Sequence, residues 1–350
     1  MNQMKKNFLP VRILAIETSR DETAAAILEN GRVLLSSVVA SQIEIHQQYG
    51  GVFPEVASRQ HVRDIYGVVE QALQQAHMSL DNMDAIAVTR GPGLAGSLVV
   101  GMNMAKGIAI GKQLPLIGVN HLESHIYSAW LYPDETPNPP APPEFPLLAL
   151  LVSGGHTELI IMKEHLVYQR LGGTLDDAAG EAFDKVARLF SLSYPGGPSI
   201  QNAAQTGNIK AFNFPRARME GTWDFSFSGV KTSVLRVVQD LEKSGRPLPV
   251  FDLAASFQEA IVDVLFQKTM QAAKEFNVKN IIVAGGVSAN QALRDRFLGQ
   301  HDIPVFIPPL KYCTDNAAMV AAAGYFRFVH GMTDTLDIDV LPTWPISFTL

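Results

Sequence analysis

The sequence has almost no cysteine and no long apolar run. Cys313 is the only cysteine among the 350 residues. No disulfide can therefore form within the chain, which favours a cytoplasmic protein. No secretory signal is recognisable near the start, because Pro10 and Arg12 interrupt the apolar residues there. The most apolar stretch, residues 94–111, contains Asn103 and Lys106 and predicts a buried helix with no membrane span.

Positive charge is also scarce. The 28 lysines and arginines are outnumbered by 34 acidic residues, which leaves a net charge of −6. This balance argues against a protein that binds nucleic acid through bulk charge, but it leaves room for a local basic patch or a basic partner. The absence of a G-x-x-x-x-G-K-[ST] sequence excludes a P-loop. The 350 residues are enough for about two domains with separate cores, and an apolar fraction of 47% argues against disorder over most of the length.

Two halves of the chain share one pattern on either side of a proline-rich stretch, residues 133–146, which contains seven prolines and reads as a linker. Residues 12–40 and 147–171 each predict three strands joined by tight turns, and Asn30-Gly31 is a strong hairpin signal. Each set precedes a helical pattern and later an apolar strand, a Gly-rich turn and a helix. We predict two similar α/β lobes, 1–132 and 147–317, with a cleft between them and with residues from about 318 to 350 packing back on the first lobe.

A Gly-x-Gly-x-x-Gly sequence spans Gly91 to Gly96, after a predicted strand and before a helix. It fits the dinucleotide fingerprint, but the next strand ends in Asn120 where that fold needs an acid. We therefore interpret these glycines as the means of a tight turn and close helix packing.

Paired glycines also end two apolar strands of the second half, in LVSGG (151–155) and AGGVSAN (284–290). Backbone N–H groups in such turns can face an anion, and ligands of α/β lobes bind at the carboxyl ends of strands. We predict a nucleotide held by these loops, with Asp184 accepting ribose hydroxyl protons and YPGGPS (194–199) closing over it. The alternatives are purely structural turns and a solvated acidic helix face formed by Asp177, Glu181 and Asp184.

His121 and His125 lie four residues apart in GVNHLESHIYSAW, directly after a short apolar strand. On a helix both imidazoles project from one face. Asp315 precedes a predicted helix, where it or Thr314 is a good N-cap. Two exposed histidines and a carboxylate are alternatively a recognised ligand set for a divalent metal.

Ten motifs occur in order between residues 11 and 346: ETSRDET, GGVFPEVASRQH, GPGLAGSL, NHLESH, LVSGGHTEL, DDAAGEAFDKVARLF, YPGGP, FSFSGVKT, AGGVSANQAL and CTDNAAM. Their order and spacing resemble those of the bacterial tRNA N6-adenosine threonylcarbamoyltransferases, once labelled O-sialoglycoprotein endopeptidases. The resemblance implies the duplicated α/β fold of actin, sugar kinases and Hsp70 (ASKHA). It also implies transfer of a threonylcarbamoyl group from threonylcarbamoyl-AMP to N6 of the adenosine 3′ of the anticodon, in tRNAs that read codons beginning with A.

The resemblance also assigns residues and partners. It implies one divalent ion per subunit, iron(II) in preference to zinc, on His121, His125 and Asp315. It implies a metal-free paralogous partner and a small P-loop ATPase, and no membrane. Two features depart from the family pattern: Arg20 replaces the usual Cys, and the linker is longer and richer in proline. The implied substrate-binding positions are Leu151, Val152, Ser153, Gly154, Gly155, Asp184, Gly197 and Asn290.

The donor is a mixed anhydride with AMP as leaving group, so no enzyme nucleophile is needed, and we expect Asp21 or Glu22 to accept the N6 proton. Candidate tRNA contacts are Arg59, Arg63, Arg216, Arg218 and Lys231, each of which is alternatively solvated or ion-paired. Three other functions compete. A metallopeptidase of the H-E-x-x-H type places its glutamate directly after the first histidine, unlike Glu123 here. A carbamoyltransferase that acts on a small-molecule hydroxyl and a non-catalytic scaffold are the others.

Overall fold

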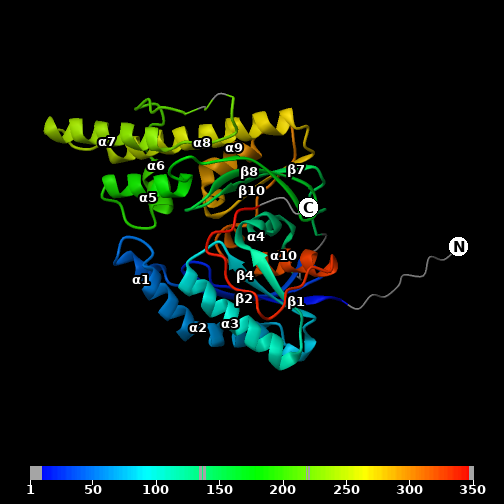
Figure 1. The fold of residues 1–350 in the computed structure, drawn as a ribbon. Helices are drawn as coiled ribbons and strands as arrows, with labels where there is room; N and C mark the ends of the chain where they lie inside the picture. The colour runs from blue at the N-terminus through cyan, green and yellow to red at the C-terminus, as the bar shows by residue number, and fades with distance from the viewer. Residues whose placement is uncertain (1–9, 134–135, 137–138, 218, 220, 347–350) are drawn as a thin grey trace. The chain divides into compact units, whose positions relative to one another are not determined.

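The structure, a computed structural model, describes residues 10–133, 136, 139–217, 219 and 221–346. Figure 1 draws its helices and strands as a ribbon. The chain divides into two compact units. Unit 1 comprises the described parts of Met1–Ser41, Pro54–Pro140 and Asn316–Trp344. Unit 2 comprises the described parts of Gln42–Phe53, Ala141–Asp315 and Pro345–Leu350. The division expected from the sequence did not assign residues 42–53 to the second unit.

The sheet of unit 1 has the strand order β5-β4-β1-β2-β3-β6. Strands β1, β2 and β3 form the predicted antiparallel meander, and Asn30 and Gly31 both have positive φ in its second turn. Strands β4 and β5 continue the sheet parallel to β1, while β6 pairs with β3. Their bounds are β1 Arg12–Glu17, β2 Glu22–Glu29, β3 Val33–Ser41, β4 Ala85–Gly91, β5 Leu116–Asn120 and β6 Tyr132–Pro133.

Side chains alternate between the two faces along each strand, so the apolar strands of this sheet present apolar side chains on both faces. Helices cover both faces. Leu14 and Ile16 of β1 belong to a core formed with α2 (Pro54–Gln75) and α3 (Ala95–Lys112). Ile13 points the other way, toward α10 (Ala317–Val329), where Gly324 allows close approach. Helix α10 also packs on α4 (His121–Tyr127). Short 3-10 turns occupy Leu80–Asn82 and Ser128–Trp130.

The glycines of the Gly91 to Gly96 motif act in packing, as interpreted from the sequence. Gly91 has φ +154, and a Cβ there would lie 1.8 Å from the carbonyl oxygen of Leu341. A Cβ on Gly93 would lie 2.6 Å from the carbonyl oxygen of Ser19. Backbone segments therefore occupy the space that a side chain would need, and this turn fixes the end of β1 against the start of α3.

The sheet of unit 2 repeats the plan of unit 1, with the strand order β11-β10-β7-β8-β9. Strands β7, β8 and β9 form an antiparallel meander, and β10 and β11 extend it parallel to β7. A central strand with a hairpin on one side and parallel strands on the other is common to both sheets, which confirms the predicted duplication. The bounds are β7 Leu147–Val152, β8 Thr157–Glu164, β9 Val167–Gly173, β10 Asn280–Ala284 and β11 Val305–Phe306.

The helices of unit 2 build its core around the central α8, which buries sixteen residues. The part of the chain that the structure describes contains no helix with the length and hydropathy of a membrane span. This includes α3, which covers most of the apolar stretch at residues 94–111. Short 3-10 turns occupy Gly286–Ala289 and Leu310–Tyr312. The helices are α1 Ile43–Gln47, α5 Ala179–Leu189, α6 Gly196–Ala204, α7 Ser228–Lys243, α8 Val250–Glu275 and α9 Gln291–Leu298.

Candidate metal centre and substrate-binding loops

His121 and His125 lie on one face of α4, as their spacing predicted. Strand β5 ends at Asn120, whose side-chain Oδ1 accepts the N–H of Leu122 at 2.9 Å and so starts the helix. The two imidazole centroids are 4.8 Å apart with planes at 80°. Both side chains are buried, at 3% and 1% exposure, so the expectation of exposed imidazoles was wrong.

Asp315 directly precedes the point where unit 1 resumes with α10. Asn316 is the N-cap of that helix, because its Oδ1 accepts the N–H of Met319 at 3.0 Å. The alternative that Thr314 or Asp315 caps α10 is therefore wrong. The structure instead brings Asp315 to the histidines: one ligand atom from each of His121, His125 and Asp315 lies within 4.8 Å of the others.

The chemistry of these donors fits a divalent transition metal. Two imidazole nitrogens and one carboxylate oxygen are the set typical of iron(II) sites that keep open coordination positions, and imidazole also suits zinc. Most of the cluster is buried, with Asp315 half-buried. We infer a site that can hold one ion and still admit a further ligand.

A buried carboxylate that the sequence analysis missed supports His121. Oε2 of Glu17, at the end of β1, lies 3.1 Å from His121 Nδ1, and Glu17 is fully buried. Thr89 Oγ1 donates to the same oxygen at 2.6 Å, and Ser19 Oγ lies 3.2 Å from His121 Nδ1. The available signal in the sequence was an acid at the end of an apolar strand that is followed by a polar turn.

Glu123, which a peptidase mechanism would need as its base, is held by another charge. Its Oε2 accepts two hydrogen bonds from Arg327, at 2.6 Å from Nη2 and 3.1 Å from Nε. Glu123 is 1% exposed. A carboxylate in this buried ion pair is poorly placed to activate water, which argues against the peptidase alternative.

The turn that carries Asp21 and Glu22 is fixed by a buried histidine on α2. His61 Nε2 donates to the carbonyl oxygen of Arg20 at 2.9 Å, and its Nδ1 lies 2.8 Å from Thr23 Oγ1. Glu22 Oε1 accepts from Ser41 Oγ at 2.9 Å. Asp21 and Glu22 are half-buried, and their role as base stays a prediction.

The two paired-glycine loops of unit 2 lie side by side. Strands β7 and β10 are parallel neighbours, with Leu151 opposite Ala284. Gly285 has φ +94, and a Cβ there would lie 2.5 Å from the carbonyl oxygen of Val152. The carboxyl ends of these strands thus carry both loops, as the nucleotide prediction requires.

The remaining predicted substrate positions join these loops. Asp184 Oδ1 accepts the N–H of Gly196 at 2.8 Å, which places α5 against the start of α6 beside Gly197. Asn290 caps α9, accepting from Leu293 N–H at 3.1 Å, and its Nδ2 donates to Gln258 at 2.7 Å. The amide of Asn290 is therefore held within the protein, and its contact with a ligand stays a prediction.

The three acidic residues of the predicted acidic face have different partners. Asp177 precedes α5 and accepts from Lys185 at 2.6 Å and from Lys231 at 2.7 Å. Burial alone would raise the pKa of Asp177, but the hydrogen bonds from the two lysines outweigh it and leave the pKa below its ordinary value. Glu181 pairs with Lys185 at 2.8 Å. For Lys231, the ion-paired alternative holds.

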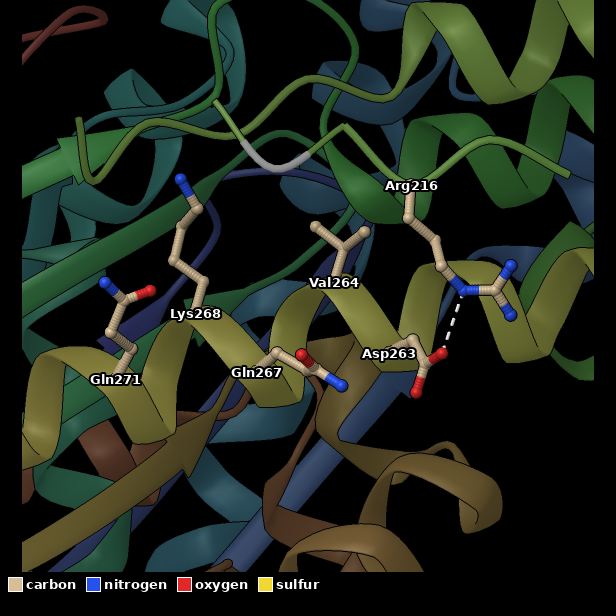
Figure 2. Close-up of a pocket in the computed structure, with 6 residues that line it drawn as sticks. All are labelled: Arg216, Asp263, Val264, Gln267, Lys268 and Gln271. Atoms are coloured by element: carbon tan, nitrogen blue, oxygen red, sulfur yellow. Dashed lines mark hydrogen bonds and ion pairs between the residues drawn. The ribbon is translucent and has the colours of Figure 1, made fainter. Parts of the chain in front are cut away.

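Arg216 is likewise engaged, in a pocket of about 210 Å³ along α8 (Figure 2). Its Nε donates to Asp263 at 2.8 Å, the pair joined by a dashed line in Figure 2. Lys268, in the same pocket, donates to the carbonyl oxygens of Thr222 and Asp224. Of the other predicted tRNA contacts, Arg59 and Arg63 are exposed on α2, and Arg218 lies outside the described residues.

Known proteins of similar fold include the HypF protein of T. kodakarensis. It is 14% identical with a TM-score of 0.61, over 93% of this chain and 50% of that one. Component A of the Acidaminococcus fermentans (R)-2-hydroxyglutaryl-CoA dehydratase is 16% identical with a TM-score of 0.51, over 91% and 99%. At these identities the likeness establishes the fold alone, and it confirms the ASKHA-like prediction.

Sequence relatives are far more similar. The chain is 53% identical to a tRNA N6-adenosine threonylcarbamoyltransferase of Dehalococcoides mccartyi, over 96% of this chain and all of that protein. It is 50% identical to the Bacillus subtilis protein of that name, over 94% of each. The sequence model of that family matches residues 33–322. The chain belongs to the tRNA N6-adenosine threonylcarbamoyltransferase family.

Proposed function

We propose that this transferase takes the threonylcarbamoyl group from threonylcarbamoyl-AMP and places it on N6 of the adenosine 3′ of the anticodon, with release of AMP. The substrate tRNAs are those that read codons beginning with A, and the compartment is the cytoplasm, where tRNA is used. The observation that carries the metal-dependent form of this proposal is the approach of His121, His125 and Asp315 to within 4.8 Å.

When bound to these three residues, a divalent ion, iron(II) in preference to zinc, supplies Lewis-acid polarisation of the donor. The chain's own groups do the rest. Backbone N–H groups of Gly154 and Gly155 stabilise charge on the departing phosphate. Asp21 or Glu22 accepts the proton that N6 loses, because a delocalised adenine amine is a weak nucleophile until it is deprotonated.

Protein partners are part of the proposal: a metal-free paralogue and a small P-loop ATPase. Helices α2 and α3 of unit 1 support it, because Val62 and Tyr66 on α2 are 64% and 68% exposed and Ile110 on α3 is 62% exposed. Val62 and Tyr66 are four residues apart and so lie on one face of α2, and large exposed apolar side chains on one helix face are typical of a protein interface. We assign this face to the paralogue, which would cover these exposed apolar side chains with an apolar surface of its own.

Reconstitution tests the function. The chain is incubated with threonine, bicarbonate, ATP, the upstream synthetase, both partners and tRNA, and the digested tRNA is searched for threonylcarbamoyladenosine. Formation of this nucleoside that depends on the chain supports the proposal. Threonylcarbamoylation of a small-molecule hydroxyl with unmodified tRNA would favour the alternative carbamoyltransferase.

Replacing Asn290 by alanine is expected to weaken AMP binding about fivefold while metal content stays unchanged, because one hydrogen bond is worth about 1 kcal/mol. Asn290→Asp is the matched variant, since a carboxylate keeps the α9 cap but loses the amide donor. Calorimetry with AMP measures both. Wild-type affinity in the two variants would place the nucleotide elsewhere.

The isolated chain is expected to bind tRNA weakly, because few phosphates are neutralised at a net charge of −6. The binding that remains should be strongly salt-sensitive, because it depends on contacts with those phosphates. Arg59→Ala and Arg63→Ala should each lower the slope of log affinity against log salt by about 0.9 for duplex contacts and less for single strands. Arg216→Ala is the comparison, because Arg216 is paired with Asp263. Equal slopes in all variants would mean that tRNA binds another face.

A further inference from the structure

Glu17 is a fully buried carboxylate that contacts Ser19, Thr89 and His121. Its Oε1 accepts the backbone N–H of Ser19. Its Oε2 accepts from Thr89 Oγ1 at 2.6 Å and lies 3.1 Å from His121 Nδ1. A carboxylate in such surroundings is costly to bury unless its acceptor positions are satisfied, so each of these contacts is significant.

The topology of unit 1 explains why these groups meet. Strands β4, β1 and β5 are parallel, with β4 between the other two, and their carboxyl ends lie at one edge of the sheet. Glu17 is the last residue of β1, Thr89 lies near the end of β4, and His121 follows β5 directly. The contact between Glu17 and His121 therefore joins the sheet to the helix that carries the metal-binding histidines.

The direction of the hydrogen bonds identifies the histidine tautomer. An ionised carboxylate is an acceptor and cannot donate, and Thr89 already donates to the same oxygen. With Glu17 ionised, Nδ1 of His121 carries the proton, which Glu17 Oε2 at 3.1 Å and Ser19 Oγ at 3.2 Å can both accept. In a neutral imidazole the lone pair is consequently on Nε2, the nitrogen left for the metal.

We propose that Glu17 is a positioning residue of the metal centre: it holds His121 in the Nδ1–H tautomer, with Nε2 directed to the ion. The proposal rests on the metal role assigned to His121 above. Carboxylates that accept the second N–H of a metal-bound histidine fix its ring and raise its basicity, and their loss typically lowers metal affinity about 10- to 100-fold.

Glu17→Gln is the diagnostic substitution. If the glutamine oxygen keeps the bond from Ser19 N–H, its NH₂ faces His121 Nδ1 and favours the other tautomer, with the proton on Nε2. If the amide flips, its NH₂ meets the N–H of Ser19, donor against donor. Neither arrangement reproduces the wild-type pattern, although volume and shape are kept.

Glu123→Gln is the matched control. Glu123 is also a buried glutamate, lies on α4 itself and pairs with Arg327. A general loss of stability would appear in both variants. A change of His121 tautomer is expected in Glu17→Gln alone.

The experiment has two readouts. Long-range ¹H–¹⁵N spectra of the metal-free chain at high pH report the tautomer of His121, and chelator competition with Zn²⁺ or Co²⁺ alone reports affinity. We expect Nδ1–H in wild type and in Glu123→Gln, and loss of that tautomer in Glu17→Gln. Metal binding should be about 10- to 100-fold weaker than in wild type in Glu17→Gln and less affected in Glu123→Gln, which breaks the pair with Arg327 but keeps the contact between Glu17 and His121.

The proposal is overturned by an Nε2–H tautomer of His121 in wild type, a measurement that needs no variant to fold. It is also overturned if Glu17→Gln binds metal within twofold of wild type. A wild-type chain that binds no metal would contradict the metal part of the proposed function instead, while the tautomer measurement would still decide the role of Glu17.

Discussion

Replacing His125 by alanine is expected to slow threonylcarbamoyl transfer about a thousandfold and to remove most of the bound metal. Loss of one of three protein ligands disables the Lewis acid, which contributes several kcal/mol to transition-state stabilisation, and each 1.36 kcal/mol is a factor of ten in rate. The same result is expected for His121→Ala. Metal content and transfer rate are measured on the same preparations.

Burial makes a fold control necessary, because His125 is 1% exposed and its truncation leaves a cavity. His125→Gln fills more of that space, so a circular dichroism spectrum like that of wild type is required of it before its activity is interpreted. His301→Ala, at an exposed histidine of unit 2, should change neither metal content nor rate. Full activity of His125→Ala without bound metal would refute the metal mechanism.

Local periodicity was enough to predict the elements that carry the site. The alternating strands, the Asn30-Gly31 turn and the spacing of His121 and His125 depend on residues near in sequence, so one chain contains the signal. The shared pattern of the two halves also predicted the duplication. Boundaries were less predictable: α5 begins at Ala179, so Asp177 is outside the helix on which it was placed.

Long-range pairings could not be predicted in the same way. Glu17 and His121 are separated by 104 residues, and Glu123 and Arg327 by 204. Nothing in their local sequence indicates the partner, because the contacts depend on the order of strands in the sheet. The N-cap of α10 was misjudged for a related reason: three neighbouring residues, Thr314, Asp315 and Asn316, all suit a cap, and the structure uses Asn316.

The pair between Glu123 and Arg327 leads to the second large expected effect. Arg327→Met should lower the free energy of unfolding by about 3–5 kcal/mol, because it leaves a buried carboxylate without its compensating charge. The Arg327 side chain is 14% exposed and that of Glu123 is 1% exposed, so solvent screens the pair little. The destabilisation should extend to α4, since Glu123 lies on that helix between the two histidines. Metal affinity should therefore fall together with stability.

Denaturant unfolding of Arg327→Met is compared with that of Lys112→Met, which breaks an exposed pair with Asp81 in the same unit. An exposed pair contributes at most about 1 kcal/mol, so the two variants should differ clearly. In the double variant Glu123→Gln with Arg327→Met no uncompensated charge remains, and much of the lost stability should return. If Arg327→Met is no less stable than Lys112→Met, the pair is not a structural determinant of α4, and the orientation of its histidines must depend on the contact between His121 and Glu17.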